Sequence, residues 1–161
     1  MLKSYQKRVV KISVQIAFLA VSLIFVYFKP FYIIKVVGDS MKPTILRDSI
    51  VLANALDTKY SVGDVVVVEQ DGNLIIKRIA FLEKQKFFCL DLGYRRYQPA
   101  PVIKDMQYQI NYLKKFGVKA YIYEVPNKQV FLLGDNELES EDSREFGSVP
   151  LQNIKGKIIY Y

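Results

Sequence analysis

The chain divides into one long apolar stretch near its beginning and a remainder in which short apolar runs alternate with polar turns. Residues 12–28 are 17 consecutive positions without a charged side chain. In a helix, at roughly 1.5 Å per residue, they span about 25 Å, slightly less than a hydrocarbon core of about 30 Å. Val9 and Val10 extend the apolar length, with the flexible stem of Lys11 carrying its charge outward. The pattern predicts a transmembrane anchor over residues 12–28.

Basic residues are more frequent before this stretch than after it. Those before it are Lys3, Lys7, Arg8 and Lys11, and those after it are Lys29 and Lys35. Because positive charge favours the cytoplasmic side, we expect a single-pass protein of the cell membrane, with residues 1–11 inside and residues 31–161 outside. A cleavable signal peptide and a buried core helix are the alternatives. The following segment lacks a small-x-small cleavage site, and few polar residues could face solvent.

Beyond Pro30 the apolar runs become short and turn residues separate them, which is typical of β structure. The turn at residues 71–73, Asp-Gly-Asn, is a hairpin signal. The runs that predict strands are 31–37, 49–53, 64–69, 74–81, 87–92, 120–125, 130–133 and 157–161. Residues 105–116 favour a helix that Gly117 ends. We therefore expect a mostly β domain over residues 31–161, with a less regular insertion at about residues 83–118.

Composition narrows the chemistry, because the chain has no histidine and a single cysteine. The absence of histidine excludes a Ser-His-Asp triad, a Cys-His dyad and any histidine-ligated zinc within this chain. Cys89 cannot form an internal disulfide, and its apolar neighbours favour a core position. We predict neither a metal nor a cofactor. A nucleophilic serine would need another base, for which lysine is the main candidate.

The net charge of +7 and the pI near 9.3 fit either an anionic membrane surface or nucleic acid as a partner. The sequence contains no dense Lys/Arg run and no familiar nucleic-acid motif. With the apolar stretch beside it, the charge favours a lipid bilayer, and we predict no nucleic-acid partner.

Four short boxes carry the candidate chemistry. They are residues 38–44 (GDSMKPT), 63–67 (GDVVV), 76–79 (IKRI) and 134–147 (GDNELESEDSREFG). In this order they resemble the boxes of the signal peptidase I family, and the resemblance covers residues 1–82 and 126–161. One box alone is moderately specific, whereas four in register behind an N-terminal apolar segment are highly specific.

The resemblance implies a signal-peptidase-like β-barrel or sandwich domain behind an N-terminal transmembrane helix. It also implies a membrane-anchored serine endopeptidase whose partners are signal-peptide-bearing precursor proteins of the export pathway. Carried over by position, Ser40 is the nucleophile and Lys77 the general base. The supporting residues implied are Ser140, which orients the lysine, Asp142 paired with Arg144, and Arg78 paired with Asp135.

A lysine accepts a proton only in its neutral form. With an ordinary pKa of about 10.4, all but roughly one lysine in 2,500 is charged at pH 7. Burial lowers this value by up to about 3–5 units. Lys77 follows the apolar residues 74–76, which fits the requirement. A strand lysine facing solvent is the alternative here, and a surface ion pair is the alternative for Asp142 and Arg144.

The substrate is expected to bind as an added strand beside residues 31–37 and 74–77. Shallow apolar pockets would then select small residues just before the cut. The residues predicted to line them are Val36, Met41, Ile45, Ile75 and Ile76. All five also fit ordinary core positions.

The chain departs from the family pattern at several places. Many members have a serine two residues before the nucleophile as a second oxyanion donor, where this chain has Gly38. Glu137 stands where an arginine is common, and residues 80–85 replace a glycine-rich turn. Three other functions stay open: a non-catalytic membrane-bound assembly factor on the same scaffold, a self-cleaving regulator, and a membrane-tethered binding module.

Overall fold

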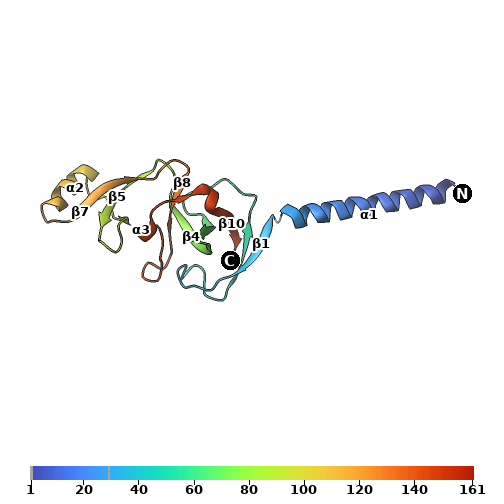
Figure 1. Ribbon diagram of the computed structural model, residues 1–161, viewed down its shortest axis with the longest axis horizontal. Coiled ribbons are helices and arrows are strands. Elements are labelled where there is room, and N and C mark those ends of the chain that lie inside the picture. Colours follow the sequence, from blue (N-terminus) through green and yellow to red (C-terminus); the bar gives the residue numbers. More distant parts are fainter. Residues whose placement is uncertain (1, 29) are drawn as a thin grey trace.

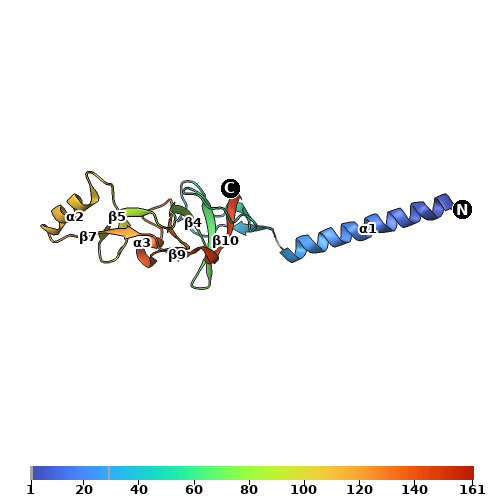
Figure 2. The same ribbon diagram turned by 90° about the horizontal axis from the view of Figure 1, so that it is seen from above.

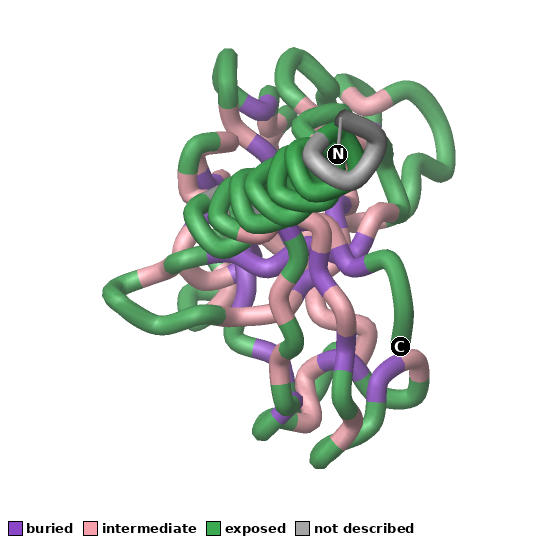
Figure 3. Tube along the Cα trace, turned by 90° about the vertical axis from the view of Figure 1, so that its right-hand side faces the viewer, coloured by how far each residue is buried: buried purple, intermediate pink, exposed green. Residues whose placement is uncertain are grey.

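The computed structural model describes residues 2–28 and 30–161. Helix α1 (Leu2–Phe28) extends away from a β-rich body, and two perpendicular views show it on its own (Figure 1, Figure 2). Buried positions gather in the body, whereas α1 is almost entirely exposed (Figure 3).

The apolar run of α1 contains polar side chains at Ser13, Gln15 and Ser22. In the part of the chain that the structure describes, no helix combines the length and the apolar character needed to cross a membrane. The transmembrane anchor predicted over residues 12–28 is therefore not confirmed, although the segment is helical as predicted.

The body is built on a seven-stranded antiparallel sheet with the order β1-β2-β10-β3-β4-β8-β9. In that order the strands are Phe31–Lys35, Ile50–Asn54, Ile154–Tyr160, Val65–Gln70, Asn73–Phe81, Gln129–Leu133 and Val149–Pro150. The last strand of the chain, β10, lies between β2 and β3 and pairs with both of them. The mostly β prediction is confirmed.

A second sheet of three strands, β6-β5-β7, lies beyond β8 at the end of the body far from α1 (Figure 1). Its strands are Gln98–Pro99, Lys86–Asp91 and Lys119–Glu124. Helix α2 (Met106–Lys114) contacts β7, and the Asp105 side chain caps it by accepting a hydrogen bond from the Tyr108 N–H. The segment predicted as a less regular insertion thus contains β5, β6 and the predicted helix. Two short elements, α3 (Ser143–Phe146) and the 3₁₀ helix η1 (Leu151–Asn153), complete the fold.

Strand β3 lies between two apolar cores, because alternate residues of a strand point to opposite faces. Val67 packs in one core with Met41 and Ile45, and Val66 packs in the other with Ile79. This burial on both faces explains why the strand is a continuous run of valines rather than an alternating pattern.

Aromatic rings join the two sheets. The ring of Phe87 on β5 lies 4.2 Å from that of Phe81 on β4 and 4.9 Å from that of Phe131 on β8, measured between centroids. Cys89 is fully buried in the same cluster, as predicted, and burial raises the pKa of its thiol to about 11.

The β3–β4 hairpin fixes the position of Lys77. Asp71 and Gly72 both have positive φ, as a two-residue turn of this kind requires, and Gln70 pairs with Asn73. The register continues to Lys77, which lies opposite Val66. A slip by one residue would exchange the faces of Lys77 and its neighbours, so the turn determines which side chain reaches the interior.

Candidate active site

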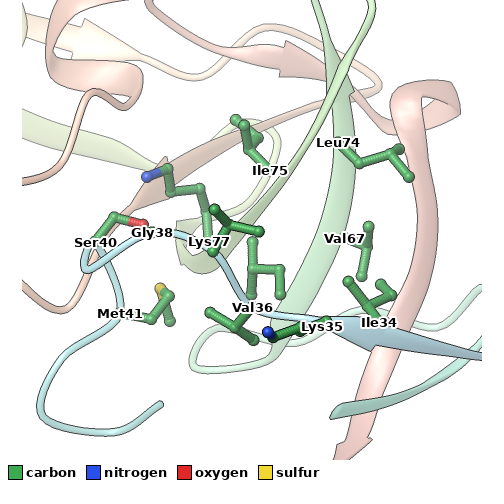
Figure 4. A pocket seen from close by; sticks show the side chains of 12 residues that line it. Ile34, Lys35, Val36, Gly38, Ser40, Met41, Val67, Leu74, Ile75 and Lys77 are labelled. Carbon is green, nitrogen blue, oxygen red and sulfur yellow. The ribbon is translucent and has the colours of Figure 1, made fainter. Parts of the chain in front are cut away.

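A cavity of about 180 Å³ lies between β1 with its following loop and the first half of β4. Ser40 and Lys77 line it together, from segments 37 residues apart in the chain. In Figure 4 the Ser40 hydroxyl and the Lys77 amine face one another at one end of the cavity. The remaining lining is mostly aliphatic, so the two polar groups meet in apolar surroundings.

The Lys77 side chain is buried, with only 3% of the residue exposed. Its amine donates a hydrogen bond to the Ser140 hydroxyl at 3.0 Å, and within the described residues no hydrogen bond joins it to Ser40. Burial lowers the pKa of the Lys77 amine, and this effect outweighs the nearby Asp142 carboxylate, which raises it.

Behind Ser140 lies a buried ion pair. The Ser140 hydroxyl donates to Asp142 Oδ2 at 2.7 Å, and Arg144 donates to both oxygens of the same carboxylate at 2.9 and 2.8 Å. Burial alone would raise the pKa of Asp142, but hydrogen bonds from Arg144, the Gly134 N–H and Ser140 together lower it. The pair is therefore an ordered interior group and not a surface contact.

Asp142 also begins helix α3. Its Oδ1 accepts a hydrogen bond from the Arg144 N–H at 3.1 Å, while Glu145 Oε2 accepts one from the Asp142 N–H at 3.0 Å. This reciprocal arrangement is a capping box, which satisfies N–H groups that a helix leaves unpaired at its start. The short helix thereby fixes the backbone that carries Ser140 and Asp142.

The loop that carries Ser40 is held by residues 134–136. The Asn136 N–H donates to the Ser40 carbonyl at 2.9 Å, and the Asn136 side chain donates to the Asp39 carbonyl at 3.2 Å. Sequence reasoning recognised this box but gave no role to Asn136 or Gly134. Their place in the Gly-Asp-Asn motif was the available signal.

Gly134 lies between the serine loop and Ser140, close to both. A Cβ at this position would come within 2.1 Å of the Ser140 hydroxyl oxygen and 2.6 Å of the Ser40 carbonyl oxygen. Both distances are far inside van der Waals contact, so only glycine fits. The close approach of the two serine-bearing segments therefore depends on a missing side chain.

Arg78, next to Lys77, forms the second predicted pair. It donates to both oxygens of Asp135 at 2.8 and 2.6 Å, and to the Gly63 carbonyl at 2.7 Å. These hydrogen bonds raise the pKa of the Arg78 guanidinium. The pair ties β4 to residues 134–136 and so joins the lysine strand to the segment that holds the serine loop.

The structure separates the predicted substrate-contacting residues into two groups. Val36, Met41, Ile75 and Ile76 line the cavity. Ile45 does not, because the chain turns back after Ser40, with the Ile45 N–H bonded to the Met41 carbonyl, and Ile45 packs in the core. Spacing alone could not distinguish these two positions.

The two sides of the cavity are strand edges. Strand β1 pairs with β2 on one side, and residues 74–77 pair with β3 on one side, whereas β8 joins β4 only from Arg78 onward. In the described part of the chain, the facing edges of β1 and residues 74–77 have no strand partner. Such edges offer unpaired N–H and C=O groups to an extended peptide.

The residues that the structure describes contain no group of three or more His, Cys, Asp or Glu side chains placed to hold a metal ion.

The chain resembles known proteins over most of its length. The model of the family described as "Signal peptidase, peptidase S26" matches residues 6–161. Mitochondrial inner membrane protease subunit 1 of Mus musculus is 30% identical over 129 residues, which cover 76% of this chain and 64% of that protein. Signal peptidase I U of Bacillus subtilis is 30% identical over 161 residues, covering 91% of this chain and 82% of the relative. Probable signal peptidase I-1 of Synechocystis is 28% identical over 159 residues, covering 88% and 74%.

The β-rich body and the buried serine–lysine–carboxylate cluster thus occur in a chain that matches one family of peptidases from near its start to its end. This chain belongs to the signal peptidase family, peptidase S26. It spans somewhat less than two thirds of the length of the mouse mitochondrial relative.

The close approach at Gly134 generates a test by stability. We expect Gly134→Ala to lower the free energy of unfolding by about 1–3 kcal/mol, because the new methyl group must displace Ser140 or the serine loop. Gly38→Ala is the matched control: a Cβ there meets nothing within 4 Å, and its φ is not positive. Denaturant unfolding of both variants measures the difference, and equal stability of the two would contradict the packing described.

Proposed function

We propose that this protein is a serine endopeptidase that removes signal peptides from exported precursor proteins, with Ser40 as nucleophile and Lys77 as general base. The observation that carries the proposal is the buried Lys77 amine, which shares an apolar cavity with the Ser40 hydroxyl. A charged amine would be costly at such a place, whereas a neutral amine is a base. Membership of the peptidase S26 family supports the same activity.

The proposed reaction uses one proton acceptor twice. Neutral Lys77 takes the Ser40 proton as the serine oxygen attacks the scissile carbonyl carbon. The resulting ammonium gives that proton to the leaving amine, so the peptide bond breaks and an acyl-serine forms. Water then attacks the acyl group, Lys77 accepts the proton of the water, and the serine is regenerated when the proton returns to it.

Ser140 orients the base in this proposal. Its single hydroxyl hydrogen goes to Asp142, so Ser140 can only accept from Lys77. A hydrogen of the amine therefore points to Ser140, and the lone pair of a neutral amine is directed elsewhere in the cavity, where Ser40 lies. Arg144 keeps Asp142 in place and offsets its charge.

The substrate would lie as an extended strand between β1 and residues 74–77, paired through its backbone with the two open edges. A cavity of about 180 Å³ with Val36 and Met41 nearly fully buried in its floor accommodates small side chains. The relatives named signal peptidase I support precursor proteins as the substrate class.

The enzyme is proposed to work at a membrane. Large apolar side chains of α1 are exposed, Phe18 and Leu19 among them, and the helix stands clear of the body (Figure 1). A relative named as an inner membrane protease supports the same location. The proposal is lipid contact of α1, with the site held beside the membrane surface.

The first test removes each member of the proposed pair. We expect Ser40→Ala and Lys77→Met each to reduce kcat for cleavage of a precursor at its signal-peptide junction by at least about 10³-fold. Mass determination of the new N-terminus identifies the product. Lys86→Met is the control, because Lys86 is an exposed strand lysine paired only with Glu124. Full cleavage by either active-site variant would contradict the proposed pair, whereas no cleavage by the wild-type protein would favour a non-catalytic assembly factor.

The pH dependence follows from the same lysine. Only the neutral amine is a base, so kcat should rise with pH as the Lys77 amine loses its proton. Since burial lowers the pKa of Lys77, the midpoint of this rise should lie below the ordinary lysine pKa of about 10.4. A midpoint at or above the ordinary value would contradict the burial argument.

Gly38 gives a gain-of-function test. It lines the cavity two residues before Ser40, and a side chain there meets open space. Gly38→Ser adds a hydroxyl that can donate to the oxyanion, and we expect kcat to rise about tenfold, below the full effect of about 10²–10³ for an oxyanion donor. Gly38→Ala separates the added hydroxyl from the added methyl group. A serine variant no faster than the alanine variant would count against an oxyanion at this position.

Membrane association is tested on the full chain. Phe18→Glu with Leu19→Glu should move the protein from the membrane fraction to the soluble fraction, because two charges replace apolar contact with lipid. Ile103→Glu, at an exposed position of the body far from α1, is the control and should leave the distribution unchanged. Sedimentation after alkaline carbonate washing measures it. An unchanged distribution for the α1 variant would exclude α1 as the lipid contact.

A further inference from the structure

The loop that carries Ser140 contains an acidic residue, Glu137, directly after Gly-Asp-Asn. Here the Glu137 carboxylate lies 3.1 Å from Arg144 Nη1 and accepts a hydrogen bond from the Gln98 side chain at 3.2 Å. The Glu137 carboxylate therefore lies between cationic and amide donors that hold this part of the loop.

Arg95 supplies one such cation from a distant part of the chain. It lies on the connection between β5 and β6, and its side chain is only 13% exposed. Its Nη2 donates to the Glu137 carbonyl at 2.7 Å, and its Nη1 lies 3.6 Å from the Glu137 carboxylate. Its Nε lies 3.0 Å from Glu145 Oε1. One guanidinium thus contacts residues on both sides of Ser140 and Asp142.

The Glu145 contact leads directly to the buried ion pair. The other oxygen of the Glu145 carboxylate accepts the Asp142 N–H at 3.0 Å. The β5–β6 connection makes a second contact with α3, in which the Tyr97 N–H donates to the Arg144 carbonyl at 3.2 Å. Glu145 therefore links Arg95 to Asp142, and Asp142 accepts the hydrogen bond of the Ser140 hydroxyl.

The loop depends on contacts with other segments for its conformation, because residues 134–142 form neither helix nor strand. Leu138, in the middle, is 90% exposed and adds no packing. At its two ends the loop is tied to Ser40 through Asn136 and to α3 through Asp142. Arg95 joins these ends through one hydrogen bond to the Glu137 carbonyl and an ion pair with Glu145. A planar guanidinium can reach both at once, which suits this task better than a flexible ammonium.

We propose that Arg95 is a positioning residue for the active site, which acts through Glu137 and Glu145 to keep Ser140 against Lys77. The inference rests on the proposed function, since it assigns Arg95 to the same base. The three-stranded sheet then belongs to the catalytic unit, because its β5–β6 connection carries the arginine that holds the Ser140 loop. Without Arg95 the loop loosens, water reaches the amine, and a larger share of Lys77 is charged at a given pH.

The experiment compares Arg95→Gln, Arg95→Lys and Lys86→Gln in the full chain. Lys86 is the matched control, since it pairs with Glu124 on the same sheet and does not touch the loop. We expect Arg95→Gln to lower kcat by about 10- to 100-fold with KM within about twofold, because a small displacement of a catalytic group costs this much. The acid limb of the kcat–pH profile should move to higher pH. Arg95→Lys should recover part of the loss.

A second readout is independent of activity. Titration of the Lys77 amine, followed by its ¹⁵N chemical shift in labelled protein, should move to higher pH in Arg95→Gln and stay unchanged in Lys86→Gln. A purely structural role of Arg95 would lower thermal stability and leave this titration in place. If Arg95→Gln does not fold, Arg95→Lys decides by the same two measurements.

The inference is overturned if a folded Arg95 variant has the kcat, acid limb and Lys77 titration of the control, or if its only effect is a higher KM. Failure of the proposed function has a different signature, because wild-type cleavage would then persist in Ser40→Ala whatever Arg95 does.

Discussion

The site depends on keeping one amine out of water. Lys77 lies on a strand whose neighbours are aliphatic, and its side chain is buried beneath the serine loop. Desolvation penalises the ammonium form, which is the largest influence on its pKa. Each pKa unit of lowering corresponds to about 1.4 kcal/mol of destabilisation of the charged form. Other contacts of the fold must supply that free energy, which makes the surrounding packing part of the chemistry.

Three segments far apart in the chain provide this packing, and each is fixed in a different way. The hairpin turn at Asp71 and Gly72 sets the register that directs Lys77 inward. Asn136 binds the serine loop from the side, through the carbonyl groups of Asp39 and Ser40. Gly134 allows both to meet Ser140, since any side chain there would occupy the position of the Ser140 hydroxyl. The geometry is therefore a property of backbone contacts as much as of the Ser40 and Lys77 side chains.

The sequence predicted local features well and long-range ones poorly. The hairpin, the mostly β character and helix α2 follow from turn residues and periodicity, which act over a few positions. The place of β10 between β2 and β3 does not, because nothing local specifies a partner about 100 residues away. Residues 83–118 looked less regular because the longest pairing of β5 is with β7, which lies outside that segment.

The boxes located the candidate residues of the site without showing how they are held. The order Ser40, Lys77, Ser140 could be read from the sequence. In the structure Ser40 and Lys77 line one cavity, and the Lys77 amine donates to the Ser140 hydroxyl. The attachment of Arg95 could not be read from the sequence, because its partners are 42 and 50 residues away and its own segment matches no box. The core position of Ile45 could not be predicted either, because an isoleucine fits a cavity lining and a core equally.

In the buried ion pair behind Ser140, Arg144 opposes the effect of the Asp142 charge on the pKa of Lys77. A full charge about 4 Å away shifts a pKa by about 3 units at an effective dielectric constant of about 20, so a lone Asp142 carboxylate would favour the ammonium form of Lys77. Arg144 acts in the opposite sense on Lys77 and binds Asp142 through two hydrogen bonds. Asp142 can then accept the Ser140 hydrogen, and so orient the amine, without holding a proton on it. The Asp142–Arg144 pair thus has a small net charge and orients Ser140 and, through it, the Lys77 amine. A large contribution to stability is not expected, since buried ion pairs lose in desolvation much of what they gain in attraction.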